Sequence, residues 1–275
     1  MTINHVDLFR QKLATGKPLW GTCLEFADPS IAELMGDIGY DFVWIDGEHA
    51  ALDRRELLGH VLACRGTGCA PLVRVPSADP VAIKPILELH PAGIIVPQVR
   101  ALAEAAGAVA SCKYPPVGTR GFGPIRGIGY GNMAGPDYLK TADAQIMVFV
   151  QIETREAVDN LTGILALEHL DGIAIGPNDL SGAYGKLGQT TDPEIVALIE
   201  RVVRQARAAG KSVGMATGHA SDRLKHWVEV GVQWIAINAD FINLTLMSRQ
   251  VLTAARHACG QPAPVGNAAS DGYAR

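Results

Sequence analysis

Short apolar runs alternate with amphipathic stretches along the chain from Leu19 onward. Runs of this length and apolar character are typical of strands buried on both faces of a parallel sheet. They predict strands over residues 20–24, 42–45, 72–75, 93–96, 146–152, 172–175, 212–215 and 234–237. The stretches between them predict helices over residues 29–38, 54–65, 80–89, 101–112, 155–165, 193–209, 221–230 and 242–257.

This alternation favours an α/β fold in which eight strand and helix units form one (β/α)8 TIM barrel over residues 1–259. A doubly wound open sheet is the alternative, but no G-x-G-x-x-G sequence follows the first strand. Several helix starts are supported by proline, because Pro29, Pro80 and Pro193 each follow an aspartate that can cap the helix. Residues 260–275 are mostly small and polar and predict a flexible tail.

The connection between residues 112 and 145 is too long for an ordinary turn after a barrel strand. It contains Tyr-Pro-Pro at 114–116 and a glycine-rich stretch at 118–126. We expect a segment without regular structure that serves as a lid, an active-site loop or a subunit contact. A phosphate-binding P-loop is not indicated, because no Gly-Lys-Ser or Gly-Lys-Thr follows the glycines.

The amino-acid composition and charge exclude several classes of protein. The chain has 275 residues, of which 48% are hydrophobic and 19% charged, and this excludes a disordered chain. No apolar run is long enough to cross a bilayer, and the first residues lack the apolar core of a signal peptide, so we expect a cytoplasmic protein. A net charge of −4 without a basic run argues against nucleic acid as a partner. The five cysteines are scattered and predict no zinc or redox pair.

Polar residues gather where the predicted strands end, and in a barrel the active site is built there. These residues are Asp46, Gly47, Glu48 and His49 after the second strand, Arg74 at the third, Gln151 and Glu153 at the fifth, and Asn178 and Asp179 after the sixth. Each has a purely structural interpretation, such as a helix cap or a surface ion pair. Their convergence on one rim is difficult to explain as scaffold and indicates a catalytic site.

The carboxylates of Glu153 and Asp179 predict a binding site for a hard divalent cation such as Mg²⁺, Mn²⁺ or Co²⁺. Two carboxylates leave positions open for water and for a 2-oxo acid such as pyruvate, whose carbonyl the ion would polarise. Arg74 can then hydrogen-bond the oxygen as it becomes enolate-like, and the backbone amides of Asn178 and Asp179 can receive the substrate carboxylate.

His49 is the predicted proton carrier, because histidine is the side chain that changes charge near neutral pH. Either Asp46 or Glu88, in the third predicted helix, can orient its ring. Schiff-base catalysis is the weaker alternative, because no lysine lies clearly at a strand end.

Four separated motifs resemble the HpcH/HpaI family of class II pyruvate aldolases, in order and spacing, over about residues 8–255. They are Asp-Gly-Glu-His-Ala at 46–50, Tyr-Pro-Pro with Gly-Thr-Arg-Gly between 114 and 121, Gln-Ile-Glu-Thr at 151–154, and Ile-Gly-Pro-Asn-Asp-Leu-Ser at 175–181. The resemblance implies a metal-dependent (β/α)8 lyase that reversibly cleaves a 4-hydroxy-2-oxo acid to pyruvate, or hydroxypyruvate, and an aldehyde.

By motif, the resemblance matches Glu153 and Asp179 to the metal ligands, Arg74 to the enolate-stabilising arginine and His49 to the acid/base histidine. It places Gln151 near pyruvate and gives the amides of Asn178 and Asp179 to the substrate carboxylate. It also implies a homo-oligomer, a trimer of dimers, in which the last helix is exchanged between subunits. The predicted helix at 242–257 is the candidate for that exchange.

Three positions depart from the family pattern. Glu88 stands where such aldolases commonly have aspartate, and residues 120–126 look more like the macrophomate synthase branch, whose members decarboxylate oxaloacetate. His219, after the seventh strand, is either a contact for the aldehyde or an exposed loop residue. Decarboxylation of oxaloacetate or a related 2-oxo diacid is therefore an alternative function, and a non-catalytic barrel that serves as a binding protein is another.

Overall fold

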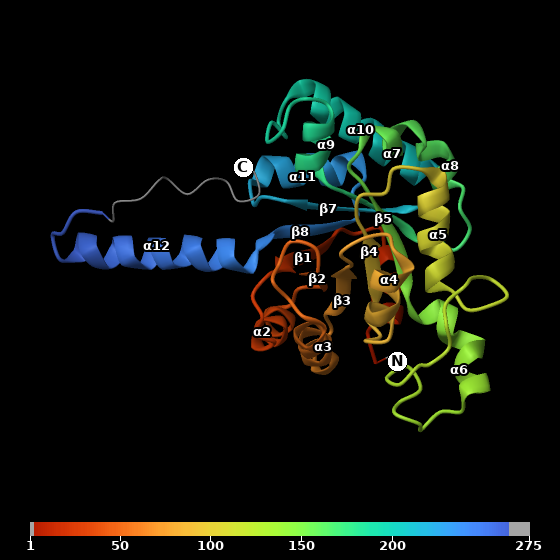
Figure 1. The fold of residues 1–275 in the computed structure, drawn as a ribbon. Coiled ribbons are helices and arrows are strands. Elements are labelled where there is room, and N and C mark those ends of the chain that lie inside the picture. Colours follow the sequence, from red (N-terminus) through yellow and green to blue (C-terminus); the bar gives the residue numbers. More distant parts are fainter. Residues whose placement is uncertain (1–2, 264–275) are drawn as a thin grey trace.

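The computed structural model describes residues 3–263 and contains a closed barrel of parallel strands arranged in chain order (Figure 1). The strands are β1 (Leu19–Leu24), β2 (Phe42–Asp46), β3 (Ala70–Arg74), β4 (Gly93–Val96), β5 (Met147–Ile152), β6 (Gly172–Ile175), β7 (Ser212–Thr217) and β8 (Trp234–Ala239). Pairing of β1 with β8 closes the sheet. The predicted (β/α)8 barrel is confirmed, and the open doubly wound sheet is wrong.

Helices connect the strands, and most of them cover the outside of the barrel (Figure 1). They are α1 (Val6–Ala14), α2 (Ser30–Ile38), α3 (Arg54–Ala63), α4 (Pro80–Leu87), α5 (Leu102–Cys112), α6 (Gly135–Ala142), α7 (Arg155–Asp159), α8 (Leu161–Leu165), α9 (Pro177–Ala183), α10 (Pro193–Ala208), α11 (Ser221–Val230) and α12 (Asp240–Ala258). The sequence did not predict α1, α6 or α9. The helix predicted over 155–165 is broken at Asn160, which leaves helical geometry and donates its side-chain amide to the carbonyl of Glu156.

The predicted aspartate caps are present at two helix starts. Asp79 accepts the N–H of Val81 at the start of α4, and Asp192 accepts the N–H of Glu194 at the start of α10, each before a proline in the first turn. Such caps satisfy amide groups that have no partner within the helix. They therefore fix where each of these two helices begins.

Aromatic side chains fill the interior of the barrel towards the amino ends of the strands. Phe42, Trp44, Phe149 and Trp234 belong to one buried cluster, in which the Phe149 and Trp234 ring centroids lie 4.8 Å apart. Gly214 is needed here, because a side chain at this position would collide with the Trp234 indole. This packing fills the barrel interior at the amino ends of the strands and leaves the carboxyl ends open for a ligand.

The long connection between α5 and β5 is an ordered part of the structure. It contains α6 and a 3-10 turn, Asp143–Gln145, so the expectation of a segment without regular structure is wrong. Its internal anchors are Tyr138, which is fully buried, and Arg120, whose guanidinium lies 4.5 Å from the centre of the Tyr114 ring. Phe122 and Ile125 remain exposed on its outer surface.

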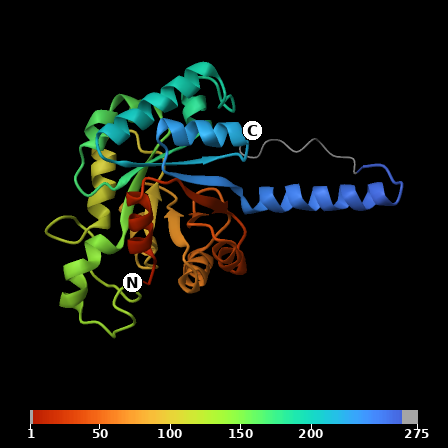
Figure 2. The same cartoon turned by 180° about the vertical axis from the view of Figure 1, so that it is seen from behind.

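The last helix, α12, projects away from the barrel (Figures 1 and 2). Asp240, in its first turn, is the one buried residue along its length, and Asp240 Oδ2 accepts the backbone N–H groups of Glu25 and Phe26. The predicted flexible tail begins just beyond this helix, and its residues 264–275 lie outside the described part of the chain. Across residues 3–263, no helix combines the length and apolar character needed to span a membrane.

Candidate functional site

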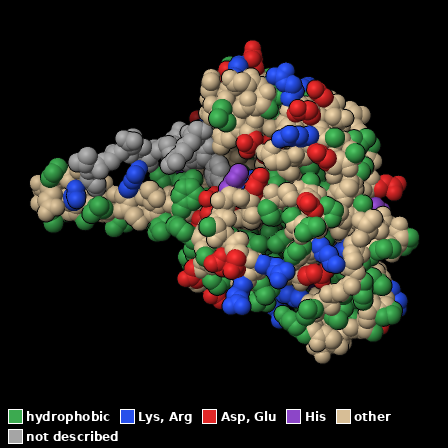
Figure 3. All heavy atoms as spheres, in the orientation of Figure 1, with side chains coloured by type: hydrophobic (Ala, Val, Ile, Leu, Met, Phe, Trp, Pro, Cys, Tyr) green, Lys and Arg blue, Asp and Glu red, His purple; other side chains and the backbone are tan. Residues whose placement is uncertain are grey.

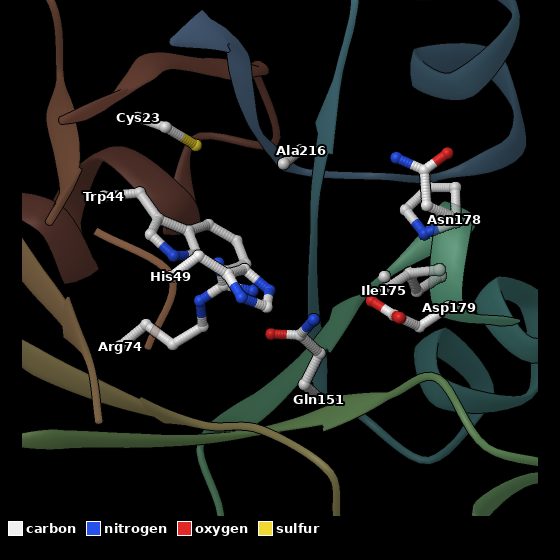
Figure 4. A pocket seen from close by; sticks show the side chains of 11 residues that line it. Cys23, Trp44, His49, Arg74, Gln151, Ile175, Asn178, Asp179 and Ala216 are labelled. Atoms are coloured by element: carbon white, nitrogen blue, oxygen red, sulfur yellow. The ribbon is translucent and has the colours of Figure 1, made fainter. Parts of the chain in front are cut away.

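A cavity of about 220 Å³ opens at the carboxyl ends of the strands. Five of the residues that the sequence singled out line it: His49, Arg74, Gln151, Asn178 and Asp179. Figure 4 shows His49 and Arg74 on one side, Asn178 and Asp179 on the other, and Gln151 between them. The predicted convergence of strand-end residues is therefore observed for these five.

Arg74 is held at the mouth by carboxylates from the neighbouring strand. It is paired in register with Asp46 in the β2–β3 ladder, and its Nε donates to Asp46 Oδ1 at 3.0 Å while Nη2 bonds the other carboxylate oxygen. Its Nη1 lies 3.2 Å from Glu48 Oε2. Gly47 allows the close approach, since a Cβ there would lie 2.6 Å from the Arg74 carbonyl.

This arrangement keeps both partners charged. Burial alone would raise the pKa of Asp46, but the hydrogen bonds and charge of Arg74 outweigh it and hold that pKa below its usual value. Burial alone would lower the pKa of Arg74, and the same hydrogen bonds with Asp46 raise it instead. The mouth therefore contains a permanent cation that is only 7% exposed.

Asp46 positions the backbone that carries His49, and it does not orient the imidazole ring. Its Oδ1 accepts the backbone N–H of Glu48 at 2.9 Å and that of His49 at 3.1 Å. The His49 side chain is 60% exposed, and its Nε2 lies 3.7 Å from Glu48 Oε2. The expectation that Asp46 supports the ring is therefore corrected: Asp46 fixes the turn, and Glu48 faces the ring.

Glu88 lies at the other end of the barrel from His49. It caps the carboxyl end of α4, where its Oε1 accepts a hydrogen bond from Arg120 Nη2 at 3.1 Å. Four residues later, Ala92 donates to the carbonyl of Pro71 near the start of β3, so this part of the chain is at the amino ends of the strands. Within one chain α4 runs antiparallel to β3 and carries Glu88 away from the mouth, so an interaction of Glu88 with His49 stays a prediction that requires a second subunit.

Glu153 lies beneath the cavity and is only 1% exposed. Its Oε1 accepts the N–H of Gln98 at 2.7 Å, and its Oε2 accepts a hydrogen bond from Gln151 Nε2. Gln98 has a left-handed backbone, with φ of 54°, which turns its N–H towards the carboxylate. Burial, together with the charges of Asp179 and Glu48, raises the pKa of Glu153 to about 7 against the opposing effect of the Gln98 hydrogen bond.

The two predicted metal ligands fit a divalent cation. Glu153 and Asp179 are close enough to repel each other electrostatically, and a cation between them would remove that repulsion. Gln151 Oε1 is buried and has no hydrogen-bond partner among the described residues, so it can accept from a water or hydroxyl in the site. Within residues 3–263 there is no group of three or more His, Cys, Asp or Glu side chains placed to hold a metal, so the protein would contribute two carboxylates.

Asp179 and Asn178 lie in the first turn of α9, directly after Pro177. The sequence placed both residues after the sixth strand without predicting a helix, and the structure has a short helix there. Its start is fixed by the fit of Gly176 against β5, because a Cβ on this glycine would lie 2.7 Å from Gln151 Nε2. The helix start therefore brings Asp179 to the same side of the mouth as Glu153.

Sequence reasoning gave no role to two groups at the site. Glu48 was noted in the Asp-Gly-Glu-His motif, and its position next to His49 was the available signal. Gln98 gave no signal, because its contribution is a backbone N–H in an unusual conformation. His219 is exposed on the loop after β7, and its Nδ1 lies 3.3 Å from Asn238 Nδ2, a contact that does not establish a role with substrate.

Comparison with known proteins identifies a family that this chain matches. Residues 21–243 match the model of the HpcH/HpaI aldolase/citrate lyase family. A hydroxypyruvate/pyruvate aldolase from Pseudomonas aeruginosa is 37% identical over 262 residues, which are 94% of this chain and 96% of that relative. A 4-hydroxy-2-oxo-heptane-1,7-dioate aldolase from Salmonella dublin is 38% identical, with 88% and 91% of the two chains covered. The crystal structure of a family member from Burkholderia cenocepacia J2315 superposes with a TM-score of 0.84 at 31% identity and covers 91% of this chain and 99% of its own.

Proposed function

The chain belongs to the HpcH/HpaI aldolase/citrate lyase family, and from this premise we propose that it is a divalent-metal-dependent class II aldolase. Its reaction is the reversible cleavage of a 4-hydroxy-2-oxo acid to pyruvate, or hydroxypyruvate, and an aldehyde. Relatives named as aldolases for both kinds of 2-oxo acid support the reaction class. The observation that carries the proposal is one small cavity lined by the buried Arg74 cation and the Asp179 carboxylate, with the buried Glu153 carboxylate close to Asp179.

Each residue has a defined task in this reaction. Glu153 and Asp179 would hold the divalent ion, which when bound would supply Lewis-acid polarisation of the keto oxygen. Arg74 donates hydrogen bonds to the same oxygen, and these strengthen as the oxygen gains charge in the enolate. His49 takes the proton of the 4-hydroxyl group as the bond between C3 and C4 breaks, and it returns a proton to C3 of the enolate.

The substrate is small and is bound mainly through polar groups. A cavity of about 220 Å³ is below the usual range for drug-sized ligands and is suited to a short 2-oxo acid. Gln151 presents its buried Oε1 to the site, and the backbone amides of Asn178 and Asp179 provide donors for the substrate carboxylate. The aldehyde partner would approach from the open side of the mouth, next to the exposed ring of His49.

An assay of the purified protein tests this function. Pyruvate release should be observed from 4-hydroxy-2-oxo acids, should cease after exhaustive chelation and should return when Mg²⁺, Mn²⁺ or Co²⁺ is added. A screen of aldehydes with pyruvate and with hydroxypyruvate, run in the synthetic direction, would define the preferred substrates. Unchanged activity after chelation would contradict the metal-dependent mechanism.

A second function uses the same residues. Decarboxylation of oxaloacetate or a related 2-oxo diacid also forms a pyruvate enolate, which Arg74 and the two carboxylates would stabilise in the same way. Activity confined to oxaloacetate would favour this function over aldol cleavage. The complete absence of metal-dependent proton exchange at the pyruvate methyl group would instead favour a non-catalytic binding protein.

The partners of the folded chain include further copies of itself. Apolar side chains follow one another along the projecting α12, where Met247 is 58% and Val251 60% exposed, and Figure 3 shows hydrophobic atoms along this helix. An apolar face this extended supports exchange of α12 between subunits of a homo-oligomer, a trimer of dimers. Leu34 and Ile38 on α2 are exposed apolar side chains as well. In Figure 1, α2 lies near the start of α12.

A further inference from the structure

A second cavity, of about 360 Å³, opens at the amino ends of the strands, away from the candidate active site. Its walls come from α1, from the residues before β4 and β5, and from the glycine-rich part of the long connection. His90 and Gln145 mark its position, because each lies shortly before a strand begins and therefore at the end of the barrel opposite to Arg74. The proposed aldol cleavage uses none of the residues that line this cavity.

Arg126 lines the cavity as a buried cation without a carboxylate partner. The residue is 3% exposed, and its Nη1 donates to the backbone carbonyls of Leu89 and His90 at 2.9 and 3.0 Å. Its Nη2 is buried and has no hydrogen-bond partner among residues 3–263. No Asp or Glu side chain in that part of the chain lies within ion-pair distance of this guanidinium, whereas Arg74 and Arg120 both bind carboxylates.

The positive charge of Arg126 is not compensated by its surroundings. Burial lowers the pKa of Arg126, Tyr130 opposes this effect, and the charge of Arg65 adds to it. A guanidinium nevertheless stays protonated in proteins, so the cost of burying this charge remains in the folded chain. An anion bound in the cavity would offset that cost.

His90 provides a neutral hydrogen-bonding group beside this cation. The residue is 1% exposed, and its Nδ1 has no hydrogen-bond partner in the described part of the chain. Burial, together with the charges of Arg126 and Arg120, lowers the pKa of His90 to about 4 against the opposing effect of Gln145. The ring is therefore neutral near pH 7, and one of its two nitrogens carries a proton that it can donate. A guanidinium and a neutral donor on one wall suit a carboxylate or a phosphate.

We propose that this cavity is a second ligand site, which binds a small oxyanion, either a carboxylate or a phosphate, through the Arg126 guanidinium and the His90 imidazole. The anion would give a partner to Arg126 Nη2 and, in the tautomer protonated there, to His90 Nδ1. Asp7, on α1, is the acidic residue among those described in the lining, so the ligand should place its charge on the Arg126 side. This site is separate from the catalytic one and does not depend on the aldolase function.

Two substitutions change the charge of the cavity wall in opposite directions and leave Arg126 and His90 in place. Met133→Glu adds a carboxylate at a lining position that is 42% exposed, and Asp7→Asn removes one. The full chain, freed of metal and chelator, is titrated by calorimetry with inorganic phosphate and with succinate. Met133→Glu should raise the Kd of the bound anion at least about tenfold, and Asp7→Asn should lower it about two- to tenfold.

Leu139→Glu is the matched control. Leu139 lies on α6, is 44% exposed and is not part of the cavity lining, so the same substitution there should leave the Kd at the wild-type value. The two titrants also separate the sources of the anion. Tighter binding of phosphate would indicate a phosphorylated ligand, and tighter binding of succinate would indicate a carboxylic acid.

Crystals of the wild-type protein soaked in selenate would locate the anion through the anomalous scattering of selenium. A peak within hydrogen-bond distance of Arg126 Nη2 is expected. Selenate bound only elsewhere, for example at Arg74, would overturn the proposal. So would equal Kd values for Met133→Glu, Asp7→Asn and wild type, or a wild-type protein that binds neither phosphate nor succinate with a Kd below about 10 mM.

Discussion

Arg74 and Asp46 are register partners on adjacent strands, and their side chains form paired hydrogen bonds inside the mouth of the barrel. Asp46 also accepts two backbone N–H groups of the turn after β2, so the arginine is fixed before any substrate binds. A donor that is already oriented needs little reorganisation when charge develops on the substrate, and this makes its stabilisation of an enolate effective. Two consecutive strand ends therefore build the electrostatic part of the site.

Arg74→Ala should abolish enolate formation while the metal ligands stay in place. We expect the exchange of pyruvate methyl protons to fall at least about a hundredfold, with metal affinity by calorimetry close to wild type. The substitution leaves Asp46 buried without its partner, so the free energy of unfolding should fall by about 3–5 kcal/mol.

The variant that combines Arg74→Ala with Asp46→Ala separates the two effects. It removes the isolated buried charge and should recover part of the stability, although two backbone amides of the turn also lose their acceptor. It should not recover the exchange reaction. An Arg74→Ala protein that exchanges pyruvate protons at the wild-type rate would contradict the role of this residue.

Gly176→Ala should disrupt the support of the metal ligand Glu153. A Cβ at this position would lie 2.7 Å from Gln151 Nε2 and would also collide with the Glu153 carboxylate. We expect metal affinity to fall at least tenfold, since partners that orient a ligand typically contribute that much. Gly107→Ala is the matched control, because a Cβ there meets no atom within 4 Å, and helix α5 should tolerate it. Equal metal affinity of the two variants would show that Gly176 is not required for this geometry.

The strand-end residues were predictable because barrel topology determines which ends of the strands meet. Once the alternation of apolar runs gave the barrel, His49, Arg74, Gln151 and Asp179 had to share one rim, as observed. The side chains that support them were harder to predict, because their contacts depend on hydrogen-bond geometry within a turn. Asp46 accepts backbone N–H groups, whereas Glu48 faces the imidazole ring of His49. Sequence spacing alone does not distinguish these two acids.

The position of Glu88 could not be predicted from the sequence for a different reason. Its sequence position suggested a partner for His49, but the direction of α4 places it at the opposite end of the barrel.

In the long connection, the short helix α6 was not predicted, because glycines and prolines surround it, and burial of Tyr138 stabilises it. Tertiary contacts of this kind can override local helix propensity, and the pattern of apolar and polar residues does not reveal them.

The raised pKa of Glu153, about 7, predicts how metal binding depends on pH. Protons and the cation compete for this carboxylate, so metal affinity should rise between about pH 6 and 8 and then level off. In the metal-free protein the folded state binds this proton more tightly than the unfolded chain does. Stability should therefore fall as pH rises from the unfolded pKa of about 4.3 through about 7.

Glu153→Gln provides the test of both effects. It removes the titrating group, so the pH-dependent loss of stability in the metal-free protein should decrease, and metal binding should be largely lost at every pH. Calorimetric metal titrations and thermal unfolding between pH 5 and 8 would measure the two quantities. If metal affinity of wild type were constant across this range, Glu153 would not be the carboxylate that competes with protons.

The exposed face of α12 predicts that the assembly depends on it. Met247→Glu combined with Val251→Glu places charge on two apolar positions that are 58% and 60% exposed in the single chain. If these side chains are buried against another subunit, the charges would be desolvated without a partner, and the oligomer should dissociate. Gln250→Glu adds a charge to the same helix at an exposed polar position and should leave the assembly intact. Light scattering coupled to size-exclusion chromatography would distinguish the outcomes, and identical masses for the double variant and wild type would mean that α12 does not hold the subunits together.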